Sequence, residues 1–175
     1  MLKLGDQAPS FKLKGTDNKS HGLDALKGPA GTAIIFSCNH CPYVRAYEDR
    51  LIALAKTCQP KGIEFVLINA NDALKYPSDS FESMVTRANE KSYPFRYLQD
   101  ESQEVAKAYG GQRTPEVFLF DRLLKLRYHG TIDDNYEQPQ QVKVAYLKDA
   151  LEAIVSGKDV KVKETPPVGC TIKWR

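Results

Sequence analysis

Two cysteines separated by two residues are the side chains in this sequence best suited to chemistry. Cys38 and Cys41 stand in the segment Cys38-Asn39-His40-Cys41-Pro42. Cysteines spaced in this way in the first turn of a helix lie on one face, at a spacing compatible with the roughly 4.4–6.8 Å between the Cα atoms of a disulfide. The pair can therefore close into a disulfide and open again, which predicts thiol–disulfide exchange.

The expected position of this pair at the start of a helix predicts which sulfur reacts. Unpaired backbone N–H groups and the positive end of the helix dipole favour an anion there, which lowers the pKa of a thiol from about 8.5 to roughly 3.5–7.5. We expect Cys38, the outer cysteine, to be the attacking thiolate. His40 can place positive charge near the Cys38 sulfur, and a stabilised thiolate makes the disulfide a stronger oxidant. We therefore expect the Asn39-His40 insert between the cysteines to give a more oxidising site than a Gly-Pro insert would.

The other cysteines and histidines favour simpler roles. A structural metal site needs a second pair of ligands at local spacing, whereas Cys58 and Cys170 are single and far apart. Cys58 ends an amphipathic pattern and is expected to be a small buried apolar residue. His21 and His129 have no partner at a meaningful spacing and are expected to be structural. The acidic and amide residues at 133–135 are expected to form a turn.

The elements expected around the cysteine pair alternate between strands and helices. A continuous apolar run at 31–37 predicts a strand buried on both faces, and apolar residues at three- and four-residue steps from Tyr43 predict a helix that ends before Pro60. The remaining predicted elements are strands at 63–68 and 95–98, helices at about 78–91 and 103–109, a hairpin of strands at 116–120 and 124–128, and a final helix at 138–156. This order predicts an α/β protein in which helices flank a central mixed sheet.

Composition and charge describe a globular protein of ordinary size. The chain has 175 residues, of which 42% are apolar and 27% charged, so it can bury a core and is not disordered. No apolar run approaches the roughly 18 residues of a membrane helix and no export signal is present, so we expect a cytoplasmic protein with no membrane partner. Basic and acidic residues balance at 20 each before Gly157, and five basic against two acidic residues follow. This distribution gives no basic face for nucleic acid.

Several segments together resemble one protein family. The opening segment Leu4-Gly5-Asp6-Gln7-Ala8-Pro9-Ser10-Phe11-Lys12-Leu13 is similar to the start of redoxin-type (alkyl hydroperoxide reductase/thiol-specific antioxidant, AhpC/TSA) proteins of the thioredoxin fold. The segment Phe36-Ser37-Cys38-Asn39-His40-Cys41-Pro42-Tyr43-Val44 resembles the peroxiredoxin-like subgroup that carries a Cys-x-x-Cys. Further segments that match the subgroup are Asn71-Asp72, Tyr76-Pro77-Ser78-Asp79-Ser80, Arg113-Thr114-Pro115-Glu116-Val117-Phe118-Leu119-Phe120-Asp121, Gly130-Thr131-Ile132-Asp133-Asp134-Asn135 and Val168-Gly169-Cys170-Thr171-Ile172-Lys173-Trp174. The resemblance implies a single thioredoxin-like domain over residues 1–175, in which 157–175 form an extended C-terminal tail.

The resemblance also implies roles for residues far from the cysteines in sequence. Pro115 would be a cis-proline that faces Cys38 and Cys41 across the site, and Thr114 would offer its backbone to a substrate chain. Thioredoxins have Trp where Ser37 stands, and they bury an acid near the second cysteine that the strand before this pair lacks. The group that takes the proton from Cys41 is therefore unassigned.

Peroxiredoxins place Pro-x-x-x-Thr/Ser-x-x-Cys around their peroxidatic cysteine, and Cys41-Pro42 resembles the end of that pattern. Ile34 stands in place of the proline, however, and Cys38 in place of the hydroxyl residue. A thiol peroxidase that uses Cys41 or Cys38 is therefore the alternative enzyme. A metal-binding or metal-delivery module that uses both cysteines and His40 is the alternative that is not an enzyme.

The C-terminal tail is expected to pack back onto the domain. Pro166-Pro167 makes an extended approach to Gly169-Cys170, while Ile172 and Trp174 would be unfavourable in water. If the tail packs near the Cys-x-x-Cys pair, Cys170 could be a third redox thiol. If it packs elsewhere, Cys170 is an inert surface cysteine.

These observations predict a thiol–disulfide oxidoreductase. Cys38 would attack a substrate disulfide, Cys41 would resolve the mixed disulfide, and the reverse cycle is equally allowed. No bound cofactor is needed, because the cysteine pair carries the electrons. The expected partners are a substrate protein or small molecule with a thiol or disulfide, and a cellular reductant of the thioredoxin or glutathione type.

Overall fold

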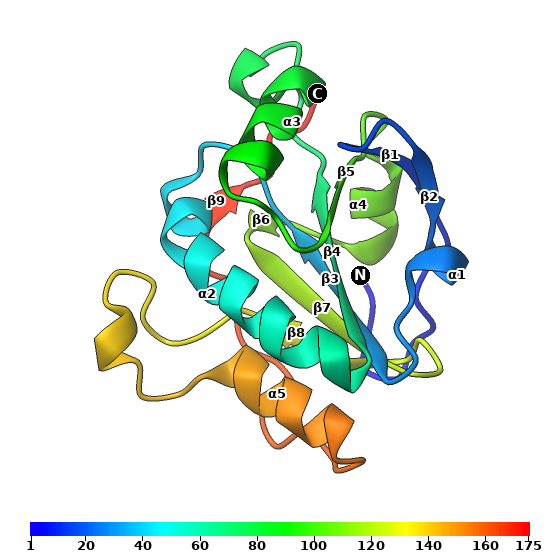
Figure 1. Cartoon of the computed structure of the whole chain (residues 1–175), viewed down its shortest axis with the longest axis vertical. Helices are drawn as coiled ribbons and strands as arrows, with labels where there is room; N and C mark the ends of the chain where they lie inside the picture. Colours follow the sequence, from blue (N-terminus) through cyan, green and yellow to red (C-terminus); the bar gives the residue numbers. More distant parts are fainter.

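A computed structural model describes residues 1–175, and Figure 1 shows a central sheet with helices on both faces. In chain order, the elements are β1 (Lys12–Gly15), β2 (Ser20–Gly22), α1 (Leu23–Leu26), β3 (Gly31–Phe36), α2 (Pro42–Cys58), η1 (Gln59–Lys61), β4 (Ile63–Asn69), η2 (Pro77–Asp79), α3 (Phe81–Glu90), β5 (Arg96–Gln99), α4 (Glu104–Tyr109), β6 (Arg113–Thr114), β7 (Glu116–Asp121), β8 (Leu126–Gly130), η3 (Pro139–Gln141), α5 (Tyr146–Val155) and β9 (Cys170–Thr171). No helix among them combines the length and the apolar character needed to cross a membrane.

The main sheet has seven strands in the order β2-β1-β5-β4-β3-β7-β8. Strands β3, β4 and β5 run parallel, because α2 carries the chain back between β3 and β4, and α3 does so between β4 and β5. The hairpin β7–β8 adds two antiparallel strands at the edge beside β3. The sheet is therefore mixed, and the predicted α/β class is confirmed.

Strand residues alternate between two cores. On β3, Ala33 and Ile35 point to one face, where they pack with residues of α2, α3 and α5. Ile34 and Phe36 point to the other face, which α1, α4 and the N-terminal segment cover. The central strands are apolar on both sides for this reason, and they form a rigid frame whose C-terminal ends carry the cysteine segment.

The structure differs from the sequence prediction at the last helix. This helix begins at Tyr146 and not near residue 138, because residues just before it form hydrogen bonds with the loop around Asp134. Lys143 donates its backbone N–H to Asp134 Oδ1, and Asp134 donates its own to the carbonyl of Val144. The N-terminal hairpin β1–β2 was not predicted either, since its short strands are mostly exposed and carry little apolar pattern.

The C-terminal tail packs back onto the domain, as expected from its apolar residues. Thr165 donates its backbone N–H to the carbonyl of His129, and His129 donates its own to the carbonyl of Lys163, so the tail first runs along the free edge of β8. It then crosses the Pro115 segment, and β9 pairs with β6 in a second, two-stranded sheet. Ile172 is buried beyond this pairing. Figure 1 shows β9 next to β6, near the start of α2.

A buried carboxyl group fixes the turn that leads into β7. Glu116 is fully buried and accepts the backbone N–H groups of Gln112 and Arg113 at 2.6 and 2.8 Å. Its second oxygen lies 2.7 Å from Nε2 of His129 on β8. The expectation that His129 is structural is consistent with this contact, and His21 pairs with Asp17 near the other edge of the sheet. The Glu116 carboxylate therefore holds the β6–β7 connection in place.

Replacing Glu116 by Ala should destabilise the protein, because it leaves His129 and the backbone N–H groups of Gln112 and Arg113 without this acceptor. Removing one partner of a buried pair costs roughly 3–5 kcal/mol, to be measured as a lower free energy of unfolding in urea. Glu101→Ala is the matched control, since Glu101 is exposed and should change stability by no more than about 0.5 kcal/mol. Equal unfolding midpoints for the two variants would contradict the role of Glu116.

Candidate active site

The cysteine segment lies at the C-terminal end of β3, and it enters α2 later than the sequence suggests. Helix α2 begins at Pro42, and Cys41 is its N-cap residue with an extended backbone. Proline suits the first helical position, because its missing N–H would have no partner there. Cys38 therefore stands in the loop before the helix, and the prediction that both cysteines lie in its first turn is wrong.

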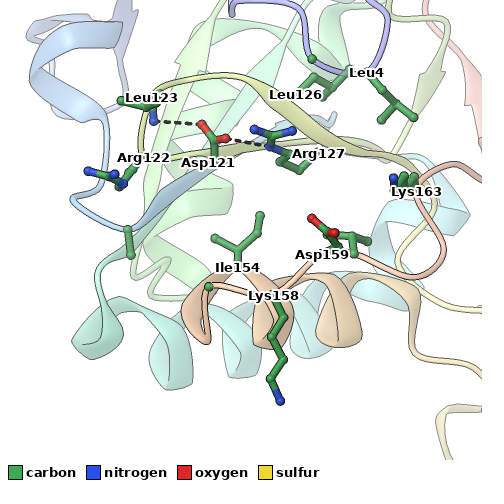
Figure 2. A pocket seen from close by; sticks show the side chains of 14 residues that line it. Leu4, Asp121, Arg122, Leu123, Leu126, Arg127, Ile154, Lys158, Asp159 and Lys163 are labelled. Atoms are coloured by element: carbon green, nitrogen blue, oxygen red, sulfur yellow. Dashed lines mark hydrogen bonds and ion pairs between the residues drawn. The ribbon is translucent and has the colours of Figure 1, made fainter.

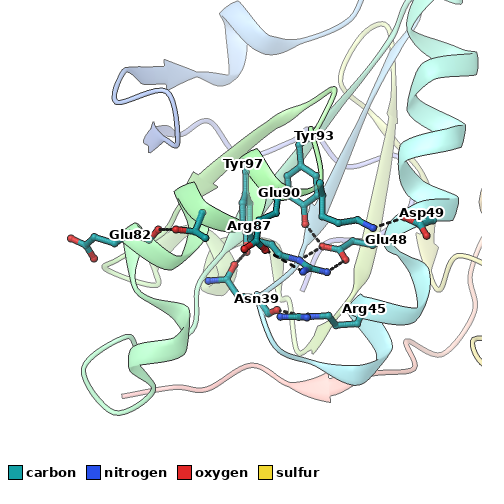
Figure 3. Close-up of polar contacts among 11 residues, drawn as sticks. Asn39, Arg45, Glu48, Asp49, Glu82, Arg87, Glu90, Tyr93 and Tyr97 are labelled. Atoms are coloured by element: carbon teal, nitrogen blue, oxygen red, sulfur yellow. Dashed lines mark hydrogen bonds and ion pairs between the residues drawn. The ribbon is translucent and has the colours of Figure 1, made fainter.

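Asn39, between the two cysteines, is buried and holds this loop through four hydrogen bonds. Its backbone N–H donates to Asp79 Oδ1 at 2.8 Å, and its side-chain amide donates to the carbonyl of Ser78 at 3.0 Å. Tyr97 donates its hydroxyl to Asn39 Oδ1 at 2.7 Å. The Asn39 carbonyl accepts Nε of Arg45 at 2.9 Å, and Figure 3 shows Asn39 between Tyr97 and Arg45. The loop is therefore anchored and not free to open.

Asp79, Tyr97 and Asn69 are the supporting residues that the sequence analysis missed. Asn69 ends β4 and donates to Asp79 Oδ1 at 3.1 Å. Residues that follow adjacent parallel strands meet at one edge of the sheet, so the polar run after β4 was a signal that could have placed Asn69 beside Cys38. Tyr97 comes from β5, and no sequence pattern connects it to Asn39.

The Thr114–Pro115 peptide bond is cis, as the family resemblance implied, and this segment faces both cysteines. Cys38 Sγ lies 3.5 Å from Thr114 Oγ1. Cys41 Sγ lies 3.3 Å from the Thr114 carbonyl oxygen, to which its thiol donates when protonated. The two sulfurs are therefore held against one residue of β6.

The surroundings of the two sulfurs separate their pKa values. The hydrogen bond from Cys38, followed by contacts from Cys170 and from the N–H of Val44, lowers the pKa of Cys41 to about 4 although burial opposes this. The hydrogen bond to Cys41, burial and the negative charge of Asp79 raise the pKa of Cys38 well above that of an ordinary thiol. These contacts favour a thiolate on Cys41 at the helix N-cap, whereas the sequence predicts one on Cys38.

The C-terminal tail supplies a third cysteine to this cluster. Cys170 on β9 lies opposite Thr114 in the register of the two-stranded sheet and packs against Cys38, Cys41 and Val44. The Thr114 backbone, which the resemblance assigns to a substrate chain, is thus paired with the protein's own tail. Cys58, in contrast, is buried in the main core at the far end of α2, as expected.

His40 lies on the exposed side of the cysteine segment. It lines a small polar pocket of about 260 Å³ together with Arg45, Arg87 and Glu90, among others. Arg87 is held there by a bidentate contact with the buried Glu48, visible in Figure 3. The side chains that border the site at His40 are thus all polar.

The largest pocket is unrelated to the cysteines. It measures about 500 Å³ and lies at the end of β7 away from Pro115, lined by Asp121, Arg127 and Lys158, among others. Figure 2 shows the Asp121–Arg127 ion pair on its wall. No group of three or more His, Cys, Asp or Glu side chains in the structure is arranged to hold a metal ion.

Comparisons with known proteins agree with this fold. The model of the AhpC/TSA family matches residues 4–129, and the chain belongs to that family. No curated protein matches it. An uncharacterised conserved protein from Geobacillus kaustophilus is 45% identical with a TM-score of 0.93, over 100% of this chain and 94% of the other.

Two more distant structures share the thioredoxin-like fold at 16% identity. The thioredoxin domain of a thiol-disulfide oxidoreductase from Bacteroides vulgatus aligns with a TM-score of 0.69 over 89% of this chain and 99% of the other. Peroxidoxin BcpB from Mycobacterium tuberculosis aligns with a TM-score of 0.68 over 90% of this chain and 98% of the other. The predicted fold is confirmed, and the family supports redox chemistry in general.

The reduced protein should carry a Cys41 thiolate at neutral pH, because its pKa is lowered to about 4. Thiolate absorbance in the ultraviolet should disappear as the pH falls through this value and should be missing in Cys41→Ser but not in Cys58→Ser. Ionisation of Cys41 also stabilises the folded state. This stabilisation is complete at a pH above the pKa of a free thiol, roughly 8.5, and it decreases as the pH falls to about 4. A thiolate that titrates near 8.5 would contradict the assignment.

Proposed function

We propose that this member of the AhpC/TSA family is a thiol–disulfide oxidoreductase that works through Cys38 and Cys41. The observation that supports this best is the pairing of a stabilised thiolate with a protonated thiol beside it, both against Thr114. Exchange requires one sulfur that attacks and a second that resolves, and a low-pKa thiolate attacks and leaves readily.

The chemical roles follow from the pKa values and reverse the order expected from the sequence. The Cys41 thiolate attacks one sulfur of a substrate disulfide, which forms a mixed disulfide and releases the first substrate thiolate. Cys38 then attacks the Cys41 sulfur, the Cys38–Cys41 disulfide forms, and the second substrate thiolate leaves with the proton. The substrate gains two electrons and the cysteine pair loses two.

The mixed disulfide itself activates Cys38. The largest cause of its raised pKa is the hydrogen bond to Cys41, and this cause is lost once Cys41 carries a substrate sulfur. Cys38 can then ionise more easily and attack. The proton thus stays on Cys38 until the step that needs its thiolate. β3 carries no carboxylate that could accept this proton earlier.

The remaining site residues and partners belong to the same proposal. Thr114 and Pro115 would position the cysteines, and exposed His40 would border an incoming substrate. The pair would be returned to the reduced state by a thioredoxin- or glutathione-type donor in a reducing compartment such as the cytoplasm. The substrate would be a disulfide of a protein or of a small thiol.

Oxidation of the reduced protein in glutathione buffers should produce an intramolecular Cys38–Cys41 disulfide, detected by mass-spectrometric mapping of blocked thiols. Because the Cys41 thiolate is stabilised, the reduction potential should lie nearer the roughly −120 mV of a strong oxidant than the roughly −270 mV of thioredoxin. Cys41→Ser should abolish exchange. Cys58→Ser is the matched control and should behave as the wild type. Absence of this disulfide in every buffer would refute the proposal.

Peroxide reduction is the second candidate, favoured by one specific observation. The contacts of Cys41 favour a thiolate on it, at the position where the family resemblance places a peroxidatic cysteine, and a hydroxyl group is also present on Thr114. Attack of the Cys41 thiolate on a hydroperoxide would break the O–O bond, release an alcohol or water, and leave a sulfenic acid for Cys38 to condense with.

If the site reduces peroxides, the Cys38→Ser/Cys170→Ser variant, which lacks both thiols that pack beside Cys41, should accumulate a sulfenic acid on Cys41 when hydrogen peroxide is added. A sulfenic-acid-specific label and mass spectrometry would detect it. Cys41→Ser/Cys38→Ser is the control and should give no label. A reaction with peroxide no faster than that of free cysteine at the same thiolate concentration would leave disulfide exchange as the activity.

A further inference from the structure

The two cysteines of the pair are almost completely buried, which limits the access of an external thiol to them. Cys38 is 3% exposed and Cys41 is 6% exposed. Cys170 is the most exposed member of the three-cysteine cluster and contacts the Cys41 side chain. An external thiol therefore meets Cys170 before it can reach either sulfur of the pair.

The tail is shaped to lie against the cis-proline segment. A Cβ atom on Gly169 would lie 2.1 Å from the Thr114 carbonyl oxygen and 2.7 Å from its carbonyl carbon, so a larger residue cannot occupy this position. Thr114 then pairs with Cys170 in the antiparallel register of β6 and β9. Gly169 thus brings the following cysteine to the residue that faces the catalytic sulfurs.

Both ends of this crossing are fixed. Upstream, Thr165 bonds to His129 through its backbone and to Thr131 through its hydroxyl. Downstream, Lys173 donates its backbone N–H to Asn71 Oδ1 at 2.9 Å, and its carbonyl accepts the backbone N–H of Asp72 at 2.8 Å. The tail is therefore placed over the site by specific contacts.

We propose that Cys170 is a third redox-active thiol, which passes disulfides between the buried Cys38–Cys41 pair and an external thiol. The inference rests on the proposed function and adds to it the route by which the pair is reached. Strand β9 acts as an internal substrate strand, because it occupies the backbone edge of Thr114 and presents its own cysteine to Cys41.

The exchange conserves atoms and electrons. Starting from the Cys38–Cys41 disulfide, the Cys170 thiolate attacks the Cys41 sulfur, a Cys41–Cys170 disulfide forms, and Cys38 leaves and takes up a proton. An external thiolate then attacks the exposed Cys170 sulfur and releases the Cys41 thiolate. A second external thiol cleaves the resulting mixed disulfide on Cys170, so two external thiols are oxidised to one disulfide and the protein regains two thiols.

The charges around Cys170 suit this sequence. Burial and the contact with Cys41 raise the pKa of Cys170 to about 11 in the reduced protein, which keeps it protonated. Once Cys41 is in a disulfide its negative charge is gone, while the positive charges of Lys173 and Arg113 remain and favour the Cys170 thiolate. In the second step, in which an external thiolate attacks Cys170, Cys41 is a good leaving group because its thiolate is stabilised.

The first test is a trapping experiment with the full-length Cys38→Ser variant, oxidised with glutathione disulfide, quenched in acid and mapped by mass spectrometry. We expect a Cys41–Cys170 disulfide within the monomer, and its loss in Cys38→Ser/Cys170→Ser. Accumulation of glutathione on Cys41 with Cys170 free would overturn the proposal.

The second test leaves every cysteine in place. Gly169→Val should displace the tail, and a displacement of about 1 Å can reduce a rate roughly 10²-fold. We expect the oxidised variant to be reduced by glutathione about 10-fold to 10²-fold more slowly than the wild type. Val168→Ala is the matched control, because Val168 is exposed and should not alter the rate. Reduction of Gly169→Val as fast as the wild type, or faster, would overturn the role of Cys170.

The two proposals fail in different ways. If the wild type forms no Cys38–Cys41 disulfide in any buffer, the proposed function itself is wrong. If that disulfide forms and external thiols reduce it at the same rate in Gly169→Val, the pair exchanges directly and only the role of Cys170 is lost.

Discussion

Burial of the two sulfurs of the Cys-x-x-Cys pair is the constraint on which the site depends. Cys41 is 6% exposed, and an ion in such a place must be compensated by the protein. Its compensation comes from the N-terminus of α2 and from two neighbouring thiols, since Cys38 and Cys170 both hydrogen-bond to it. A charge on Cys41 therefore favours the protonated forms of the other two thiols.

The three sulfurs reach one point because the surrounding backbone is fixed by buried polar groups. Asp79 and Tyr97 hold Asn39 on one side of the pair. Glu116 holds the turn that leads from β6 to β7 on the other side, through two backbone N–H groups and His129. Each of these polar groups is satisfied, so the site retains a defined geometry with little freedom to rearrange.

The C-terminal tail covers both β8 and β6. Without it, the free edge of β8 and the Thr114 backbone would be unpaired, and the apolar side chain of Ile172 would lose its place in the core. A segment that pairs with the site in this way excludes water from the sulfurs, which strengthens the electrostatic effects on their pKa values. It also makes access to the pair dependent on the tail.

The sequence by itself determined the fold class and most strands and helices, because apolar periodicity and short-range spacing are local properties. It also indicated that the tail packs back, from the apolar residues it carries. Only the tertiary structure decided which cysteine stands at the helix terminus, because α2 begins at Pro42 and Cys41, not Cys38, is its N-cap residue. Likewise, the meeting of Cys170 with Cys41 arises from pairing between strands 56 residues apart at Thr114 and Cys170, and no local pattern specifies such contacts.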